Sequence, residues 1–122
     1  MGSPRFQELL VYQLSEKLAD TIWRIVRGWG IHDRNTVGLQ IVRSADSIGA
    51  NIAEGTGRGS YKDNKRFVRM ARGSLYETQH WLRRAYCRQL LSQDEMQTLK
   101  ELIDSLSPKL NAYLKSIGQG EK

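Results

Sequence analysis

Apolar residues recur at intervals of three and four residues along almost the whole chain, and this periodicity is the strongest constraint on its fold. Leu10, Leu14, Leu18 and Ile22 show it in the first segment. Such spacing places side chains on one face of an α-helix, and no segment shows the two-residue alternation of a half-buried strand. The pattern predicts four helices, at about 6–28, 37–54, 61–90 and 93–117.

Four amphipathic helices with short connections predict an all-α fold, an antiparallel up-down-up-down four-helix bundle. The 122 residues are enough for one domain, 1–122, with a single core. The only cysteine, Cys87, excludes an internal disulfide and fits a reducing compartment. There is no export signal, and no apolar run approaches the ~20 residues that span a bilayer. We therefore expect a cytoplasmic protein with no membrane partner.

Local signals predict where the helices begin and end. Residues 31–36 form a polar connection in which Asn35 or Thr36 can cap the second helix. Gly55 is the expected C-cap of that helix, with a short turn after it. The glycines of EGTGRGS are not a nucleotide cradle, because they follow a helix and lack the lysine and hydroxyl residue of a P-loop.

Two serines and a proline complete these signals. Ser60 is expected to cap the third helix, with Asp63 three residues on, and Ser92 with Glu95 forms a capping box for the fourth. Pro108 removes one hydrogen bond inside that last helix, so it is expected to kink the helix or to split it.

The positive charge is concentrated in one part of the sequence. The formal net charge is +6, and residues 58–91 hold nine Lys/Arg against two Asp/Glu, a local excess of seven. On a helical wheel most of these cations fall opposite the core stripe of the third helix, with Tyr76 among them. A localised basic face is typical of proteins that bind a polyanion, most often nucleic acid, although a solvated outer face has the same pattern. The candidate contacts are Arg58, Lys62, Lys65, Arg66, Arg69, Arg72, Arg83 and Arg84.

The second predicted helix has one apolar face and one face of mostly short polar residues. A solvated face more often carries long Lys and Glu side chains. Short side chains permit close approach, so this face can meet another helix, another subunit or a phosphate backbone, or it can simply be solvated. Ala45, Gly49 and Ala53, within the apolar face, would let a neighbouring helix approach closely.

No constellation of catalytic or metal-binding residues is present in the sequence. His32 and His80 lie in separate segments, so they form no metal-ligand pair at helical spacing. Cys87 has no flanking motif and is expected to pack as a small apolar group. Glu54 and Glu77 are expected to pair with arginines such as Arg43 or Arg58. We expect no enzyme, no metal and no cofactor.

The sequence resembles the four-helix-bundle family of proteins encoded in 23S ribosomal RNA intervening sequences. Two blocks within 40–58 and 67–77 carry the resemblance, and it spans nearly the whole chain. The family's Q–R–SI–NIAEG–R and F–A–GSL–E patterns are matched here by Gln40, Arg43, Ser47, Ile48, Asn51, Ile52, Ala53, Glu54, Gly55 and Arg58, and by Phe67, Ala71, Gly73, Ser74, Leu75 and Glu77.

The resemblance implies a homopentameric barrel of four-helix bundles and a non-enzymatic role. Related accessory variability determinants of diversity-generating retroelements bind nucleic acid and a reverse transcriptase. The implied function is a basic accessory protein that binds RNA or DNA, linked to rRNA intervening sequences or to reverse transcription, with a reverse transcriptase as a further partner. The alternative is a structural or protein-interaction module. The expected polar signature or interface residues are Gln40, Arg43, Ser47, Asn51, Glu54, Ser74 and Glu77.

Overall fold

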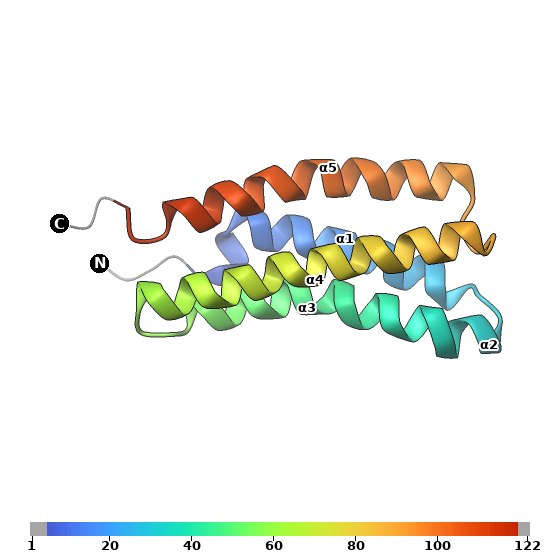
Figure 1. The fold of residues 1–122 in the computed structure, drawn as a ribbon, viewed down its shortest axis with the longest axis horizontal. Coiled ribbons are helices and arrows are strands. Elements are labelled where there is room, and N and C mark those ends of the chain that lie inside the picture. The colour runs from blue at the N-terminus through green and yellow to red at the C-terminus, as the bar shows by residue number, and fades with distance from the viewer. Residues whose placement is uncertain (1–4, 120–122) are drawn as a thin grey trace.

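Four long helices account for most of residues 5–119, the part of the chain that the computed structural model describes (Figure 1). They are α1 (Leu10–Arg27), α3 (Leu39–Thr56), α4 (Tyr61–Cys87) and α5 (Gln93–Ser116). Shorter elements are a 3-10 turn η1 (Phe6–Glu8), the single turn α2 (Ile31–Asp33) and the π-helical η2 (Arg34–Gly38). The described residues contain no strand. The ends of the predicted domain, 1–4 and 120–122, lie outside the described residues.

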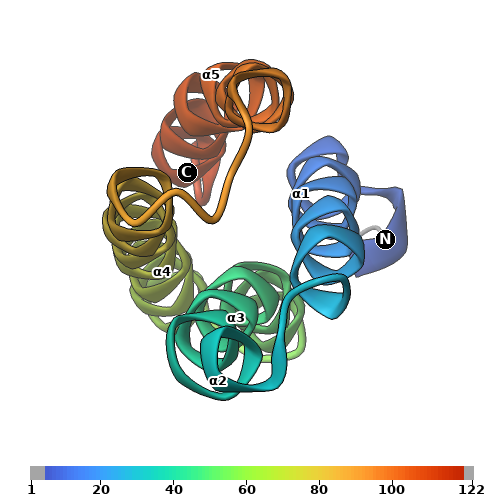
Figure 2. The ribbon, with the colours of Figure 1, turned by 90° about the vertical axis from the view of Figure 1, so that its right-hand side faces the viewer.

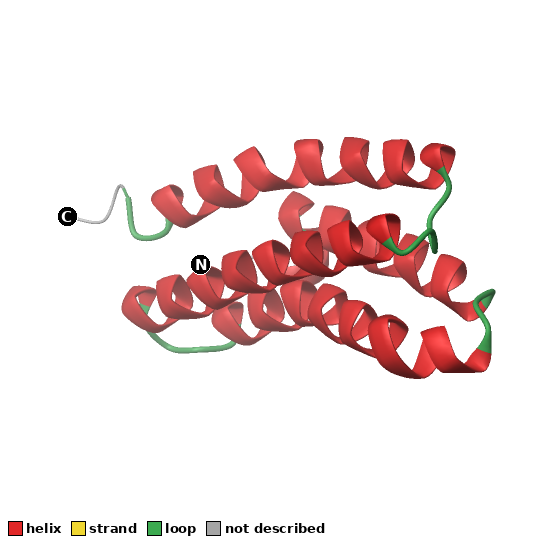
Figure 3. Cartoon of the chain, turned by 45° about the vertical axis from the view of Figure 1, so that its right-hand side comes forward, coloured by secondary structure: helices red, strands yellow, loops and turns green. Residues whose placement is uncertain are grey.

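Successive long helices run in alternating directions and form a four-helix bundle. Viewed from one end, α1, α3, α4 and α5 follow one another around a ring (Figure 2). The connections between them are short (Figure 3). Each helix contributes side chains that are fully buried in a shared core, including Leu18, Ile48, Leu75 and Leu99. Burying one such side chain contributes about 1.5–3 kcal/mol, so this core holds the helices together. No helix within residues 5–119 is long and apolar enough to cross a membrane.

The predicted polar connection at 31–36 is wrong, because the chain is already helical there. Helical structure begins at Ile31 and continues through η2 into α3, so neither Asn35 nor Thr36 is an N-cap. The Thr36 hydroxyl instead donates to the His32 carbonyl at 2.8 Å. Val37 and Gly38 are buried, and a Cβ on Gly38 would lie 2.7 Å from a methyl carbon of Val26. Packing of this segment against α1 therefore explains why the chain is already helical before α3 begins.

The end of α3 also differs from the prediction, since Gly55 lies inside the helix. The C-cap is Gly57, whose amide donates to the carbonyls of Ala53 and Glu54 at 3.3 and 3.1 Å. Gly55 is buried against α4, and a Cβ there would lie 2.5 Å from Asn64 Oδ1. This glycine is required for close packing of α3 on α4.

Two further boundaries differ from the sequence-based expectations. Helix α1 begins at Leu10, after the separate turn η1, and not at residue 6. Helix α4 ends at Cys87, short of residue 90, and Gln89 follows with a positive φ of 64°. Pro108 does not split α5, which remains one gently curved helix over Gln93–Ser116 (Figure 1).

The predicted serine caps and the predicted close helix approach are confirmed. Ser60 Oγ accepts a hydrogen bond from the Asp63 amide at 3.1 Å. Ser92 and Glu95 form a reciprocal capping box at 3.0 and 2.9 Å. Helix α1 approaches Gly49 so closely that a Cβ there would lie 3.0 Å from Ser15 Oγ.

Candidate nucleic-acid interface

A line of cationic side chains follows the outer face of α4, and we call it the α4 ridge. Its residues are Lys62, Lys65, Arg69, Arg72, Tyr76 and Arg83. At 1.5 Å per residue the ridge is about 32 Å long, close to one turn of a nucleic-acid duplex. Tyr76 is 62% exposed near its middle. A polyanion lying along α4 would therefore meet four cations along the first half of the ridge and Arg83 at its far end.

The ridge cations have few partners within the chain. Arg72 donates to Asn111 Oδ1 of α5 at 3.3 Å. Within residues 5–119, no carboxylate forms an ion pair with any other ridge cation. The two carboxylates of α4 are engaged elsewhere: Asp63 lies 3.8 Å from Arg66, and Glu77 accepts from Trp81 Nε1 at 3.1 Å. The ridge charges are thus available to an external anion.

The other three predicted nucleic-acid contacts lie on the side of α4 that faces α3. Arg58 and Arg66 lie over the Phe67 ring, with guanidinium carbons 4.8 and 4.6 Å from its centroid. Arg58 also pairs with Glu54 at 2.8 Å, as predicted for that carboxylate. Arg84 follows Arg66 by 18 residues, which is five helical turns, so it shares this side. The structure therefore divides the eight predicted contacts into a ridge group of five and an α3-side group of three.

A cleft lies at the end of the ridge that is nearest the start of α4, and we call it the Lys65 cleft. Its volume is about 460 Å³. Lys62, Lys65 and Arg69 line one wall, and residues 117–119, which follow α5, line the other. Figure 1 shows this segment turning back toward the start of α4. Among residues 5–119, no carboxylate lines the cleft.

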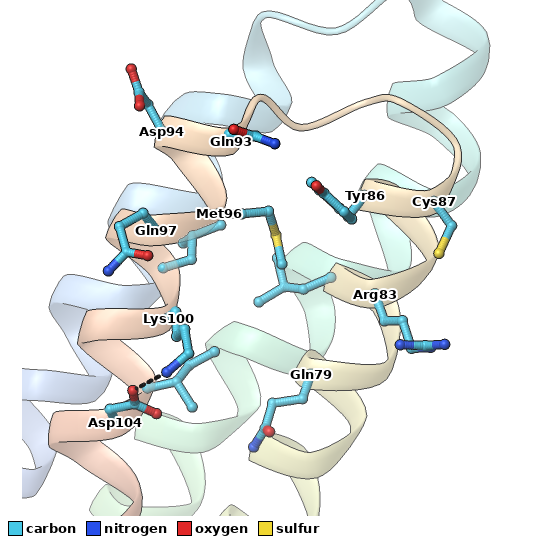
Figure 4. A pocket seen from close by; sticks show the side chains of 13 residues that line it. Gln79, Arg83, Tyr86, Cys87, Gln93, Asp94, Met96, Gln97, Lys100 and Asp104 are labelled. Atoms are coloured by element: carbon cyan, nitrogen blue, oxygen red, sulfur yellow. Dashed lines mark hydrogen bonds and ion pairs between the residues drawn. The ribbon is translucent and has the colours of Figure 1, made fainter.

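A larger groove of about 740 Å³ separates α4 from α5 near the opposite end of the ridge. Leu82, Leu99 and Ile103 contribute apolar surface, and Met96 reaches across from α5 toward α4 (Figure 4). The Lys100 ammonium on its rim contacts Asp104 at 2.7 Å. Cys87 also lines this groove and is exposed, so the prediction that it packs as a small apolar group is wrong.

The predicted polar signature lies on the surface formed jointly by α3 and α4, and we call it the mixed face. It consists of Gln40, Arg43, Ser47, Asn51, Glu54, Met70, Ser74 and Glu77. The Ser47 hydroxyl donates to the Arg43 carbonyl at 2.8 Å, and the Asn51 amide donates to the Ser47 carbonyl at 2.9 Å. The Met70 side chain is 46% exposed on this face. The mixed face therefore combines short polar groups, charges of both signs and an exposed thioether.

An acidic groove between α1 and α3 was not anticipated from the sequence. It has a volume of about 370 Å³ and includes Glu16, Asp20 and Asp46. Burial, and then the nearby Asp20 charge, raise the pKa of Asp46 above its usual value. Burial also raises the pKa of Tyr12, whose hydroxyl donates to Glu16 at 3.3 Å. Glu16 and Asp20 lie one turn apart on α1, but Asp46 comes from α3, so sequence spacing alone could not bring Asp46 beside them.

The described residues contain no group of three or more His, Cys, Asp or Glu side chains arranged to hold a metal ion. The sequence also contained no signal for Asn111 beside Arg72, and only one residue pointed to the wall at 117–119. Gly118 was the one available clue to that wall, because it follows the last helical residues. It adopts a φ of 81°, which glycine accepts readily.

The chain belongs to the 23S rRNA-intervening sequence protein family, whose family model matches residues 7–112. It is similar in fold to the crystal structure of a protein of unknown function from the S23 ribosomal protein family of Bacteroides thetaiotaomicron. That match has a TM-score of 0.77 and 22% sequence identity, and it covers 88% of this chain and 100% of the other. No curated protein sequence matches this chain.

Proposed function

We propose that this member of the family is a non-enzymatic, cytoplasmic accessory protein that binds RNA or DNA through the α4 ridge. The observation that carries the proposal is the row of five cations along about 32 Å of one helix, with no carboxylate of α4 on the same side. Phosphate contacts of this kind supply most of non-specific nucleic-acid affinity. The proposed setting is an rRNA intervening sequence or reverse transcription in a diversity-generating retroelement, with a reverse transcriptase as partner.

The decisive experiment measures affinity for RNA and DNA as a function of salt. Fluorescence anisotropy with labelled duplexes of about 20 base pairs would cover the ridge, which is about one turn long. If five phosphates are neutralised, log affinity should fall with log salt with a slope of about −4.5 for duplex DNA. Absence of binding at low salt would refute the proposal.

Matched variants test which surface is responsible. Replacing Arg69, Arg72 and Arg83 with Gln removes three ridge charges and should reduce the slope by about 2.7. Replacing Arg58, Arg66 and Arg84 with Gln removes the same charge from the α3 side and should change the slope much less. Equal effects of the two triple variants would mean that the ridge is not the binding surface.

A second candidate function, a protein-interaction module, is favoured by the mixed face. Exposed Met70 lies among short polar side chains and both signs of charge, a composition suited to a subunit interface. We propose that this face joins copies of the chain into a homo-oligomer, with a pentamer as the expected state. Nucleic-acid binding and self-association through different faces of α4 are compatible.

A further inference from the structure

We propose that the Lys65 cleft is a binding site for the terminal phosphate of a nucleic-acid strand that lies along the α4 ridge. This proposal rests on the proposed nucleic-acid-binding function and assigns a specific ligand group to one end of that surface. The cleft would hold the strand end, while the remainder of the ridge would contact internal phosphates.

The charge of the cleft selects an anion. Lys62, Lys65 and Arg69 lie within about 60° of one another around α4 and span about 10 Å along it. None of the three forms an ion pair within residues 5–119. Asp63, the nearest acidic residue in sequence, lies beside Arg66 at 3.8 Å. Three cations that no carboxylate of residues 5–119 neutralises favour a ligand that carries more than one negative charge.

The opposite wall is built by backbone that turns back after α5. Gly118 has a φ of 81°, and its α-carbon lies so close to Tyr61 that a Cβ would be 3.3 Å from two ring carbons. The Gln119 amide donates to the Ser116 carbonyl at 3.1 Å, which fixes the turn. The Ser116 hydroxyl donates to the Tyr113 carbonyl at 2.7 Å. Two carbonyls at the negative end of α5 thus already accept hydrogen bonds, which lessens their repulsion of an anion.

A strand end differs from an internal phosphate in the charge that it would bring into this cleft. Residues 117–119 stand beside the first turns of α4 and limit the cleft there. A phosphomonoester carries a charge of about −1.5 to −2 near neutral pH, whereas an internal phosphodiester carries one. The additional charge interacts with the same three cations, so a terminal phosphate should bind more tightly than a hydroxyl end.

The test compares otherwise identical single-stranded oligonucleotides that end in a 5′-phosphate, a 3′-phosphate or hydroxyls only. At moderate salt we expect one phosphorylated end to bind about tenfold more tightly than the hydroxyl control, as roughly one additional charge-assisted contact would give. Equal affinities for all three oligonucleotides would overturn the proposal, even if all bind and the general function stands.

Substitutions test whether the cleft residues cause the preference for a phosphorylated end. Lys65→Gln with Arg69→Gln should abolish the preference for a phosphorylated end. Arg83→Gln, at the far end of the same ridge, should lower the affinity for all three oligonucleotides equally and leave the preference for a phosphorylated end unchanged. Gly118→Ala changes no charge, and should reduce the preference because it displaces the wall from Tyr61. A preference that survives in the Lys65/Arg69 variant would refute the assignment.

A titration with inorganic pyrophosphate separates this proposal from the general function. Amide NMR shifts should move at Lys65, Arg69 and Gly118 in the native protein, and should not move in the Lys65→Gln, Arg69→Gln variant. These shifts are expected even if no oligonucleotide binds. If these shifts are absent from the native protein, the proposed phosphate-binding site is refuted, whatever the results with nucleic acid.

Discussion

Thr78 of α4 donates a hydrogen bond to Ser44 of α3 across the bundle core, with 3.0 Å between their hydroxyl oxygens. Both residues are buried, at 0% and 3% exposure. Ser44 in turn donates to the Ile41 carbonyl at 3.2 Å, and the Thr78 hydroxyl also lies 2.8 Å from the Ser74 carbonyl. This polar contact joins α3 and α4, the two helices that carry the mixed face.

The Ser44–Thr78 contact should give a measurable coupling energy. Ser44→Ala and Thr78→Val should each lower the free energy of unfolding by about 1 kcal/mol, since one buried hydrogen bond is lost. The double variant should lose less stability than the sum of the single variants, by about 0.5–1 kcal/mol, because each single substitution already removes the same hydrogen bond. Urea denaturation of the four proteins measures this cycle, and strictly additive losses would contradict the contact.

Gly55 and Gly73 should respond in opposite ways to alanine. A Cβ at Gly55 would lie 2.5 Å from Asn64 Oδ1 and 3.2 Å from Phe67 Cβ, so Gly55→Ala should destabilise the fold by about 1–3 kcal/mol. Gly73 has no atom within 4 Å of the added carbon, so Gly73→Ala should stabilise α4 by about 0.5–1 kcal/mol. Thermal unfolding of both variants checks this, and a stabilising Gly55→Ala would mean that the helices separate easily.

Asp46→Asn should raise the melting temperature at neutral pH. Burial and then the Asp20 charge raise the pKa of Asp46, so its ionised form is disfavoured in the folded state. Because the folded state holds the proton more tightly than the unfolded state, this destabilisation disappears as pH falls through the raised pKa. The advantage of the variant should therefore shrink in acid.

Asp104→Asn is the control for this experiment. Asp104 faces the Lys100 ammonium at 2.7 Å, so removing its charge should give no increase in melting temperature at neutral pH. A similar increase in both variants would indicate a general effect of net charge, and would contradict the local explanation for Asp46.

Met70→Glu should dissociate the proposed assembly. The thioether is 46% exposed on the mixed face, and burying a carboxylate there without a partner is unfavourable. Tyr76→Glu introduces the same charge on the α4 ridge and should leave the assembly state unchanged. Sedimentation velocity of the native protein and both variants measures this. A native protein that remains monomeric, or two variants that dissociate equally, would exclude the mixed face as the interface.

Much of the fold follows from local signals in the sequence. The three- and four-residue recurrence predicted all four long helices, because a helix repeats every 3.6 residues whatever surrounds it. The caps at Ser60 and Ser92 were predicted for the same reason, since each requires only a partner three residues away. Two of the errors lie where a second helix packs against the segment. Val37 packing extends helical structure upstream of α3, and Gly55 contacts α4 instead of ending α3.

Some features of the candidate site were likewise predictable from the sequence, and others depended on the tertiary structure. The sequence by itself determined that α4 carries the basic excess and that the ridge cations share one face, since both depend on positions along a single helix. Only the tertiary structure decided that Arg58 and Arg66 flank Phe67 on the other side, that Asp20 lies near Asp46, and that residues 117–119 close a cleft beside Lys65. These contacts join residues far apart in the chain. Their geometry depends on how the helices pack against one another, which no local pattern encodes.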